Sequence, residues 1–278
     1  MNLSDPNKIA DIIRDVSAEI IEPRFQNLSA KDIHTKSSPT DLVTIADIEA
    51  EENLTKILLD ILPGSIVLGE EAVSRNEISL DILPDQALGK INEPIWIIDP
   101  VDGTGNFARG DQKFGLILSL VYKGKTVQGW IYDIPERRMA VCEQGSGVEV
   151  NGMRKTYATP ISPLKETRGF VSHRYFPDAM RDRAKEILNE HFGKTNPYMC
   201  CAHEYLTILE GGAFFSLYTR IKPWDHAAGV LMLTEAGGYV RKWDGSEYHA
   251  QDHSGVLLCA SSPEAWNEIY EIILKPFL

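Results

Sequence analysis

The stretch WIIDPVDGTGNF, residues 96–107, combines features that pull in opposite directions. Its first three residues are apolar and are typical of a buried strand. The glycine-rich segment 103–105 predicts a loop whose backbone a phosphate group can approach closely. Between these two segments stand Asp99 and Asp102, and carboxylates repel phosphate. If phosphate binds here, a positive charge must neutralise the two acids.

Three interpretations compete for residues 99–108. Asp, Pro, Gly and Asn are turn residues, so the stretch can be an ordinary turn after a strand. Residues 103–108 also match the dinucleotide pattern G-x-G-x-x-A, but the acids would face the pyrophosphate, and no acidic residue follows where the ribose contact belongs. Hard divalent cations such as Mg²⁺ prefer carboxylate oxygens and also coordinate phosphate oxygens. A metal site therefore reconciles the acids with phosphate, and it requires further ligands.

Other parts of the chain supply acids next to the expected ends of helices and strands. VLGEEAV places Glu70 and Glu71 at the end of an expected strand, where the alternative is a solvated charged turn. KPWDHAAG places Asp225 at the start of an expected helix, where an ordinary cap is the alternative. KSSPTDLVTIAD contributes three charged residues at a helix entrance that Thr44 would cap, namely Lys36, Asp41 and Asp47. Each of these segments alone is weak evidence for a metal site, and their combination is much stronger evidence.

Composition and charge narrow the class of protein. The chain has 278 residues, of which 43% are hydrophobic and 24% charged, which is ordinary for a globular protein. A net charge of −12 argues against nucleic acid and acidic membranes as partners, because both reward clustered Lys and Arg. The four cysteines form no C-x-x-C pair, so we expect reduced thiols and a cytoplasmic protein. No signal peptide is expected, and no apolar run is long enough for a membrane span.

Hydrophobic periodicity predicts helices and strands that do not alternate strictly. Helices are expected over residues 5–23, 44–64, 178–192, 203–212, 224–238 and 263–274. Strands are expected over 65–71, 95–98, a β-meander within 115–152, 168–173, a segment near Met199, 213–218, 238–243 and 255–261. This mixture indicates an α+β or layered α/β fold. The order of expected elements changes near residue 156, from a β-meander to mixed strands and helices. This change predicts an N-terminal lobe, 1–155, and a C-terminal lobe, 156–278.

Four motifs together resemble those of the inositol monophosphatase family of metal-dependent phosphatases. They are KSSPTDLVTIAD at 36–47, GEE at 69–71, WIIDPVDGTGNF at 96–107 and PWDHAAGVLMLTEAGG at 223–238. Their order and spacing fit that family, and the resemblance spans nearly the whole chain. It implies a layered αβαβα sandwich, a Mg²⁺ requirement, hydrolysis of small phosphate monoesters, sensitivity to lithium and usually a homodimer.

The resemblance also assigns metal ligands residue by residue. It implies that Glu70, Asp99 and the backbone carbonyl of Val101 bind a first Mg²⁺ ion. It implies that Asp99, Asp102 and Asp225 bind a second. Two such ions about 3.5–4 Å apart can clamp the attacking and leaving oxygens of an in-line displacement. No His or Cys nucleophile is then required.

The catalytic and phosphate-binding residues follow from the same resemblance. Thr104 is expected to orient the attacking water and Asp47 to accept its proton. Glu71 is expected to join Glu70 in the catalytic set by contributing to a weaker third ion. The amides of Gly103 and Thr104 are expected to hold the phosphate at a helix start, beside Asp102 and Asp225.

Departures from the family pattern bear on the substrate. Gly105 leaves out a side chain near the phosphate, and the segment CCAHEY brings His203 and Glu204 close to the expected site. The stretch YTRIKP is one residue shorter than usual and carries Arg220 and Lys222 where relatives that act on inositol often have an acid. These two cations are either surface charges or contacts for a second anionic group on the substrate.

Several activities remain open. Related scaffolds include fructose-1,6-bisphosphatase, 3′-phosphoadenosine 5′-phosphate phosphatase and histidinol-phosphate phosphatase, and the fold does not decide among them. A haloacid-dehalogenase-type phosphatase is disfavoured, because it needs an N-terminal D-x-D motif and this chain has D-x-x-D in mid-sequence. From another class, the chain could be a non-catalytic binding or regulatory protein that retains the fold. The complete set of acids favours an enzyme that acts on a small phosphorylated metabolite.

Overall fold

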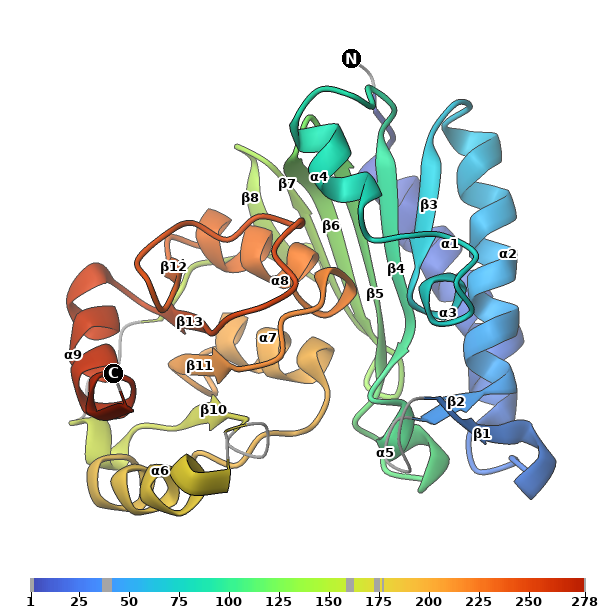
Figure 1. Ribbon diagram of the computed structural model, residues 1–278. Coiled ribbons are helices and arrows are strands. Elements are labelled where there is room, and N and C mark those ends of the chain that lie inside the picture. The colour runs from blue at the N-terminus through green and yellow to red at the C-terminus, as the bar shows by residue number, and fades with distance from the viewer. Residues whose placement is uncertain (1–2, 37–41, 159–162, 173–175, 177, 278) are drawn as a thin grey trace.

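Two large sheets organise the chain in the computed structural model, which describes residues 3–36, 42–158, 163–172, 176 and 178–277 (Figure 1). The larger sheet has seven strands, in the spatial order β3 (Ile66–Gly69), β4 (Ile95–Asp102), β5 (Gly115–Tyr122), β6 (Lys125–Asp133), β7 (Arg138–Glu143), β8 (Gly147–Val150) and β9 (Met153–Lys155). The smaller has the order β10 (Gly169–Val171), β11 (Phe215–Tyr218), β13 (Leu257–Ala260) and β12 (Tyr239–Lys242). A short pair, β1 (Ile33–Thr35) with β2 (Leu42–Thr44), stands apart.

Helices cover both faces of each sheet (Figure 1). The long helices are α1 (Pro6–Val16), α2 (Ile45–Ile61), α6 (Asp178–His191), α7 (Cys201–Leu209), α8 (Pro223–Glu235) and α9 (Pro263–Ile273), and the short ones are α3 (Glu70–Ser74), α4 (Ile82–Ala87) and α5 (Thr104–Ala108). Helices α1 and α2 lie on the outer face of the larger sheet, α7 and α8 lie between the sheets, and α6 and α9 cover the smaller sheet. The expected αβαβα sandwich is confirmed.

Alternation along the strands explains why the larger sheet is covered on both faces. In β5, Leu116, Leu118 and Leu120 belong to the core against α1 and α2, and Ile117 between them belongs to the core against α7 and α8. Helix α8 lies close to the sheet because its residues are small. A Cβ on Gly129 would lie only 3.1 Å from Ala228. The sheet thus holds the N-terminus of α8 near β4.

Most expected elements are present, including the meander, whose turn at Gly124 has a φ of 72°. Thr44 caps α2 as predicted, in a capping box with Asp47. The prediction of a strand near Met199 is wrong. Met199 has a left-handed backbone, with a φ of 59°, and helix α7 begins at Cys201, earlier than expected. Helices α3 and α4 were not predicted, since each is too short to show a periodic pattern, whereas α5 begins at Thr104, where a helix start was expected.

The lobe boundary near residue 156 stays a prediction. It falls between β9 and β10, which belong to different sheets. However, one apolar core contains residues from both sheets, such as Ile131 and Cys259. No described helix is long and apolar enough to cross a membrane.

Candidate functional site

Strand β4 continues beyond the expected end at Ile98 and carries both central acids. Asp99 lies opposite Ile117 of β5, and Asp102 lies opposite Gly115, so three steps along β4 match two along β5. In a regular strand, residues three apart point to opposite faces. The extra residue is a β-bulge, which returns Asp102 to the face of Asp99. Both carboxylates can therefore serve one site.

Three acids from different elements meet beside this bulge. Strands β3 and β4 are parallel neighbours, with Gly69 opposite Ile98, so Glu70 and Asp99 follow at the same edge. Asp225 arrives from the first turn of α8. One carboxylate oxygen from each of Glu70, Asp99 and Asp225 lies within 4.8 Å of the other two. The Oδ1 atom of Asp99 is buried and has no hydrogen-bond partner among the described residues.

Asp102 is held from the opposite side by α7. Its Oδ2 accepts a hydrogen bond from the backbone N–H of Ala202 at 2.6 Å and one from the thiol of Cys200 at 3.1 Å. Burial raises the pKa of Asp102 to about 6, although these two bonds oppose the shift. This acid therefore connects the larger sheet to the C-terminal part of the chain.

Burial and mutual repulsion make the charged form of these acids unfavourable. Burial, and next to it the charge of Glu70, raises the pKa of Asp99 and of Asp225 well above the ordinary value. Burial and the same neighbour raise the pKa of Glu71 to about 8. Two carboxylates about 4 Å apart repel by roughly 4 kcal/mol at an effective dielectric constant near 20. A divalent cation would offset both the cost of burying these charges and the repulsion between them.

One lysine already supplies part of the missing positive charge. The ammonium of Lys36 donates to Oε1 of Glu70 at 2.8 Å and to Oε1 of Glu71 at 2.7 Å. Burial opposes the charge on Lys36, but the two glutamates outweigh it and raise its pKa above the usual range. Asp41, expected in the same motif, lies outside the described residues.

Thr104 and Asp47 form a hydrogen-bonded pair at the start of α5. The Thr104 hydroxyl lies 3.0 Å from Oδ1 of Asp47 and 2.9 Å from the carbonyl oxygen of Val101. The other oxygen of Asp47 accepts bonds from the backbone N–H and hydroxyl of Thr44. Burial raises the pKa of Asp47 to about 6. Gly103 precedes Thr104 with a φ of 84°, and a Cβ there would meet the carbonyl of Lys113 at 2.7 Å, so glycine is required.

A pocket of about 120 Å³ opens next to Asp102 and Asp225. The remaining lining residues are Ser172, Met199, Cys200, Cys201, Glu204, Tyr218 and Arg220. Among the described residues of this lining, Arg220 is the basic side chain, and its charge lowers the pKa of Asp225 against the dominant effect of burial. Glu204 is buried, which raises its pKa to about 8. Of these residues, sequence reasoning singled out Arg220 and Glu204 but not Ser172 or Tyr218.

Three other predicted residues have different surroundings. His203 is buried, with Nε2 lying 3.2 Å from the carbonyl oxygen of Phe114 and 3.2 Å from Asp133, and it is not among the pocket lining. Lys222 is also outside the lining, with its ammonium 6.0 Å from the centre of the Trp224 ring. The space beside Gly105 is bordered by the guanidinium of Arg109, 3.3 Å from where a Cβ would lie.

His226, next to Asp225, has a structural environment. Its Nε2–H donates to the carbonyl oxygen of Arg220, so its Nδ1 accepts from the hydroxyl of Tyr205 at 2.9 Å. Burial lowers its pKa to about 4, which keeps the ring neutral. Both ring nitrogens are engaged, so His226 fixes the backbone before Asp225 and is not a free ligand.

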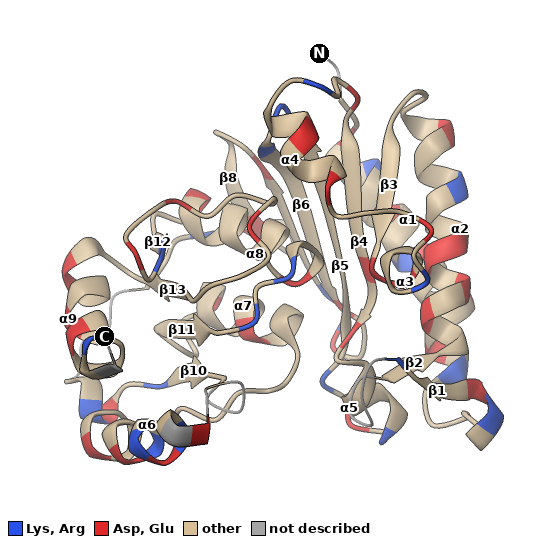
Figure 2. Cartoon of the chain, viewed as in Figure 1, with Lys and Arg blue, Asp and Glu red and all other residues tan. Residues whose placement is uncertain are grey.

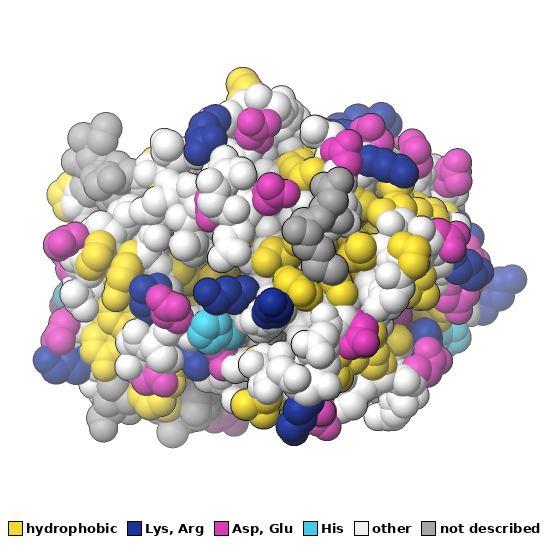
Figure 3. Space-filling model, turned by 90° about the horizontal axis from the view of Figure 1, so that it is seen from above, with side chains coloured by type: hydrophobic (Ala, Val, Ile, Leu, Met, Phe, Trp, Pro, Cys, Tyr) yellow, Lys and Arg dark blue, Asp and Glu magenta, His cyan; other side chains and the backbone are white. Residues whose placement is uncertain are grey.

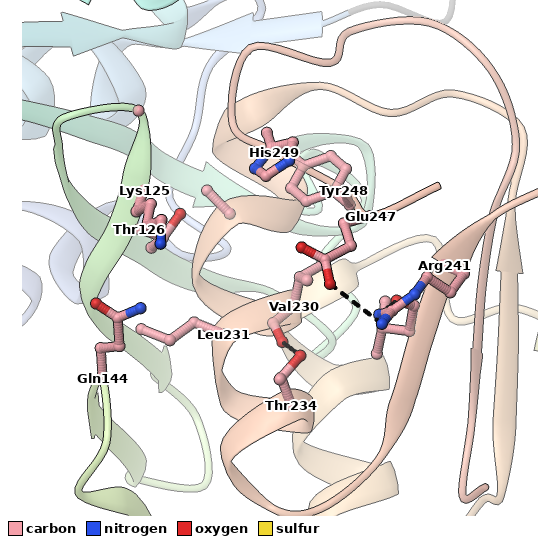
Figure 4. Close-up of a pocket in the computed structure, with 13 residues that line it drawn as sticks. Lys125, Thr126, Gln144, Val230, Leu231, Thr234, Arg241, Glu247, Tyr248 and His249 are labelled. Carbon is pink, nitrogen blue, oxygen red and sulfur yellow. Dashed lines mark hydrogen bonds and ion pairs between the residues drawn. The ribbon is translucent and has the colours of Figure 1, made fainter. Parts of the chain in front are cut away.

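A second pocket lies on the far side of α8 (Figure 4). It has a volume of about 200 Å³ and is bounded by the end of the β5–β6 hairpin, by α8 and by the segment from β12 to His249. Arg241 within it pairs with Glu247. None of the residues predicted for metal binding or catalysis lines it. Acidic residues instead gather about α3 and the end of β4, as Figure 2 shows.

Comparisons with known proteins point to one family. A sequence profile described as the inositol monophosphatase family matches residues 7–275. An inositol-1-monophosphatase of Bacillus subtilis is 28% identical, covering 93% of this chain and 92% of that protein. A protein named Nus factor SuhB from Vibrio cholerae is 29% identical over 86% of this chain and 85% of its own. The solved structure of a Thermotoga maritima IMPase superposes with a TM-score of 0.80 at 23% identity, covering 97% of this chain and 96% of the other.

Proposed function

Because the chain belongs to the inositol monophosphatase family of phosphatases, we propose that it hydrolyses a small phosphate monoester at the acidic cluster with Mg²⁺. The observation that carries the proposal is the convergence of Glu70, Asp99 and Asp225 on one point, with the Oδ1 atom of Asp99 left without a donor among the described residues. An all-oxygen donor set suits Mg²⁺. Two ions are proposed, one at Glu70, Asp99 and the Val101 carbonyl and one at Asp99, Asp102 and Asp225. A weaker third would lie near Glu71.

When bound, Mg²⁺ would neutralise the acids and phosphate and lower the pKa of water at the site. The residues of the chain perform the remaining tasks. The backbone N–H groups of Gly103 and Thr104, at the start of α5, would donate hydrogen bonds to the phosphate. The Thr104 hydroxyl has a single proton, directed to Asp47 or to the Val101 carbonyl, so its lone pairs are left to accept a hydrogen bond from water. As water passes a proton to the Thr104 hydroxyl, Thr104 can pass its own proton to Oδ1 of Asp47.

The pocket beside Asp225 supports a substrate with a second anion. Arg220 lines this pocket, and we propose that the alcohol part of the substrate lies there. Lys222, which does not line the pocket, is a weaker candidate for the same role. We therefore favour a substrate with a carboxylate or a second phosphate over plain inositol monophosphate. Fructose-1,6-bisphosphate, 3′-phosphoadenosine 5′-phosphate and histidinol phosphate remain the comparison substrates.

A phosphate-release screen tests the proposed chemistry. The panel contains inositol monophosphate, sugar bisphosphates, nucleotide phosphates and amino-alcohol phosphates, each with Mg²⁺ and with EDTA. Phosphate release should require Mg²⁺ and should be lost in Asp99→Asn. The exposed acid Asp111 gives the matched control, and Asp111→Asn should retain full activity. Release at the full rate in EDTA would refute the metal mechanism.

A binding function is the second candidate, because one relative is named as a Nus factor. Wild-type protein that releases no phosphate from any panel member in Mg²⁺ would favour that role. The partner of the site is proposed to be a small metabolite rather than nucleic acid. The net charge of −12 supports this, as does the interspersion of basic and acidic side chains on the face in Figure 3. A homodimer and a cytoplasmic setting, the latter supported by four free cysteines, complete the proposal.

A further inference from the structure

A buried glutamate on α2 reaches the short helix that carries two predicted catalytic acids. Glu51 is 3% exposed. Its Oε2 accepts a hydrogen bond from the backbone N–H of Glu71, and its Oε1 accepts one from that of Ala72, both at 2.8 Å. Helix α3 begins at Glu70, so these amides belong to the first turn, which has no partner for them inside the helix. Glu51 therefore supplies the hydrogen bonds that hold this turn in place.

The residue that would ordinarily cap α3 has no side chain to do so. Gly69 is the N-cap, with a φ of −94° and a ψ of 150°, a conformation that any residue adopts. The backbone therefore does not demand glycine here. A Cβ on Gly69 would lie 2.1 Å from the carboxyl carbon of Glu51. Glycine is required because it leaves room for a carboxylate that comes from another helix.

The position of Glu51 on α2 connects it to the rest of the site. Asp47 lies one helical turn earlier, so both buried acids project from the same face of α2. Asp47 bonds to Thr104, and Glu51 bonds to the first turn of α3. One helix face thus holds both the hydroxyl expected to orient water and the turn that carries Glu70.

We propose that Glu51, accommodated by Gly69, is a positioning residue that fixes Glu70 and Glu71 for binding Mg²⁺. Glu51 acts through the backbone of α3 and does not line the substrate pocket. The inference rests on the proposed function, since it assumes that Mg²⁺ binds at Glu70. Groups that orient metal ligands change metal affinity by about 10–100-fold when they are altered.

Isothermal titration of Mg²⁺ into substrate-free protein tests the proposal. Glu51→Gln keeps the shape of the side chain but turns an N–H₂ group toward one of the two backbone amides. We expect this variant to bind Mg²⁺ about 10–100-fold more weakly, with a much smaller change in kcat at saturating Mg²⁺. The control is Glu52→Gln, which removes the same charge from an exposed neighbour on α2 and should bind as the wild type does. Equal affinity in the two variants would overturn the inference, whereas a wild type that binds no Mg²⁺ would refute the proposed function instead.

A double-mutant cycle that begins from Gly69→Ala, in which Glu51 is kept, gives an independent test. Gly69→Ala alone should weaken Mg²⁺ binding, because the added methyl group displaces the Glu51 carboxylate. In a Glu51→Ala background there is no carboxylate to displace, so Gly69→Ala should have little further effect. Strong coupling between the two positions supports the proposal. Losses of Mg²⁺ affinity that simply add would overturn it.

Discussion

Replacing Asp102 by asparagine should stabilise the metal-free protein and weaken its response to Mg²⁺. Burial raises the pKa of this acid from 3.8 to about 6. The folded state therefore disfavours the carboxylate by about 3 kcal/mol, since one pKa unit corresponds to about 1.4 kcal/mol. The substituted side chain is not expected to lose the contact to α7, because an amide oxygen can still accept the bond from Ala202. At roughly 2–4 °C per kcal/mol, the variant should melt up to about 10 °C above the wild type in EDTA.

The pH dependence of this difference has a definite sign. Below the unfolded pKa of 3.8 the carboxyl is protonated in both states, so the two proteins should melt together. The penalty on the wild type grows as pH rises toward the folded pKa of about 6, and it is complete above it. The advantage of Asp102→Asn should therefore appear between these values and then stay constant.

Scanning calorimetry with EDTA and with increasing Mg²⁺ measures both effects. A wild type at a hundredfold excess over its Kd gains about 2.7 kcal/mol from the ion. The variant should gain clearly less, because one proposed ligand is weakened. A variant that gains as much from Mg²⁺ as the wild type would show that Asp102 is not a ligand, and the reasoning about the β4 bulge would fail.

Three further expectations concern catalysis and specificity. Thr104→Val should lower kcat by about 100-fold or more and leave Mg²⁺ binding in titration calorimetry unchanged; an unaltered kcat would remove the hydroxyl from the mechanism. Li⁺ should slow phosphate release most at low Mg²⁺, because Asp99 and Asp225 are proposed ligands of the second ion, and a rate indifferent to Li⁺ would argue against that site. Arg220→Ala should raise KM for a substrate with two anions at least tenfold more than for a simple phosphate ester, whereas Lys222→Ala should affect both little; equal effects of the two substitutions would place Arg220 outside the substrate site.

The meeting of Glu70 with Asp99 could be predicted, because acids that follow neighbouring parallel strands lie at the same edge of a sheet. The bulge in β4 could not, since an extra residue in one strand leaves no periodic signal. Without the bulge, three steps of alternation would have sent Asp102 to the opposite face.

Hydrogen bonds between acidic side chains and backbone amides could not be predicted from the sequence either. Glu51 lies four residues after Asp47, a spacing that places both on one helix face, but the amides it bonds have no signature in the sequence. The segment before α7 was expected to form a strand near Met199, but Met199 has a left-handed backbone there. Its tertiary role is to start a helix at Cys201, so that the amide of Ala202 can meet Asp102.

The proposed ligands come from distant parts of the chain, on α3, β4 and α8. A cation that needs Glu70, Asp99 and Asp225 together cannot be held until α8 has packed against the larger sheet. We expect this packing, which joins distant parts of the chain, to follow the folding transition state. Contacts that form after the transition state affect the unfolding rate and leave the folding rate nearly unchanged. Stopped-flow measurements should therefore find refolding equally fast with and without Mg²⁺, and unfolding slower with it. The ion would then govern how long a folded molecule lasts, and not how quickly it forms.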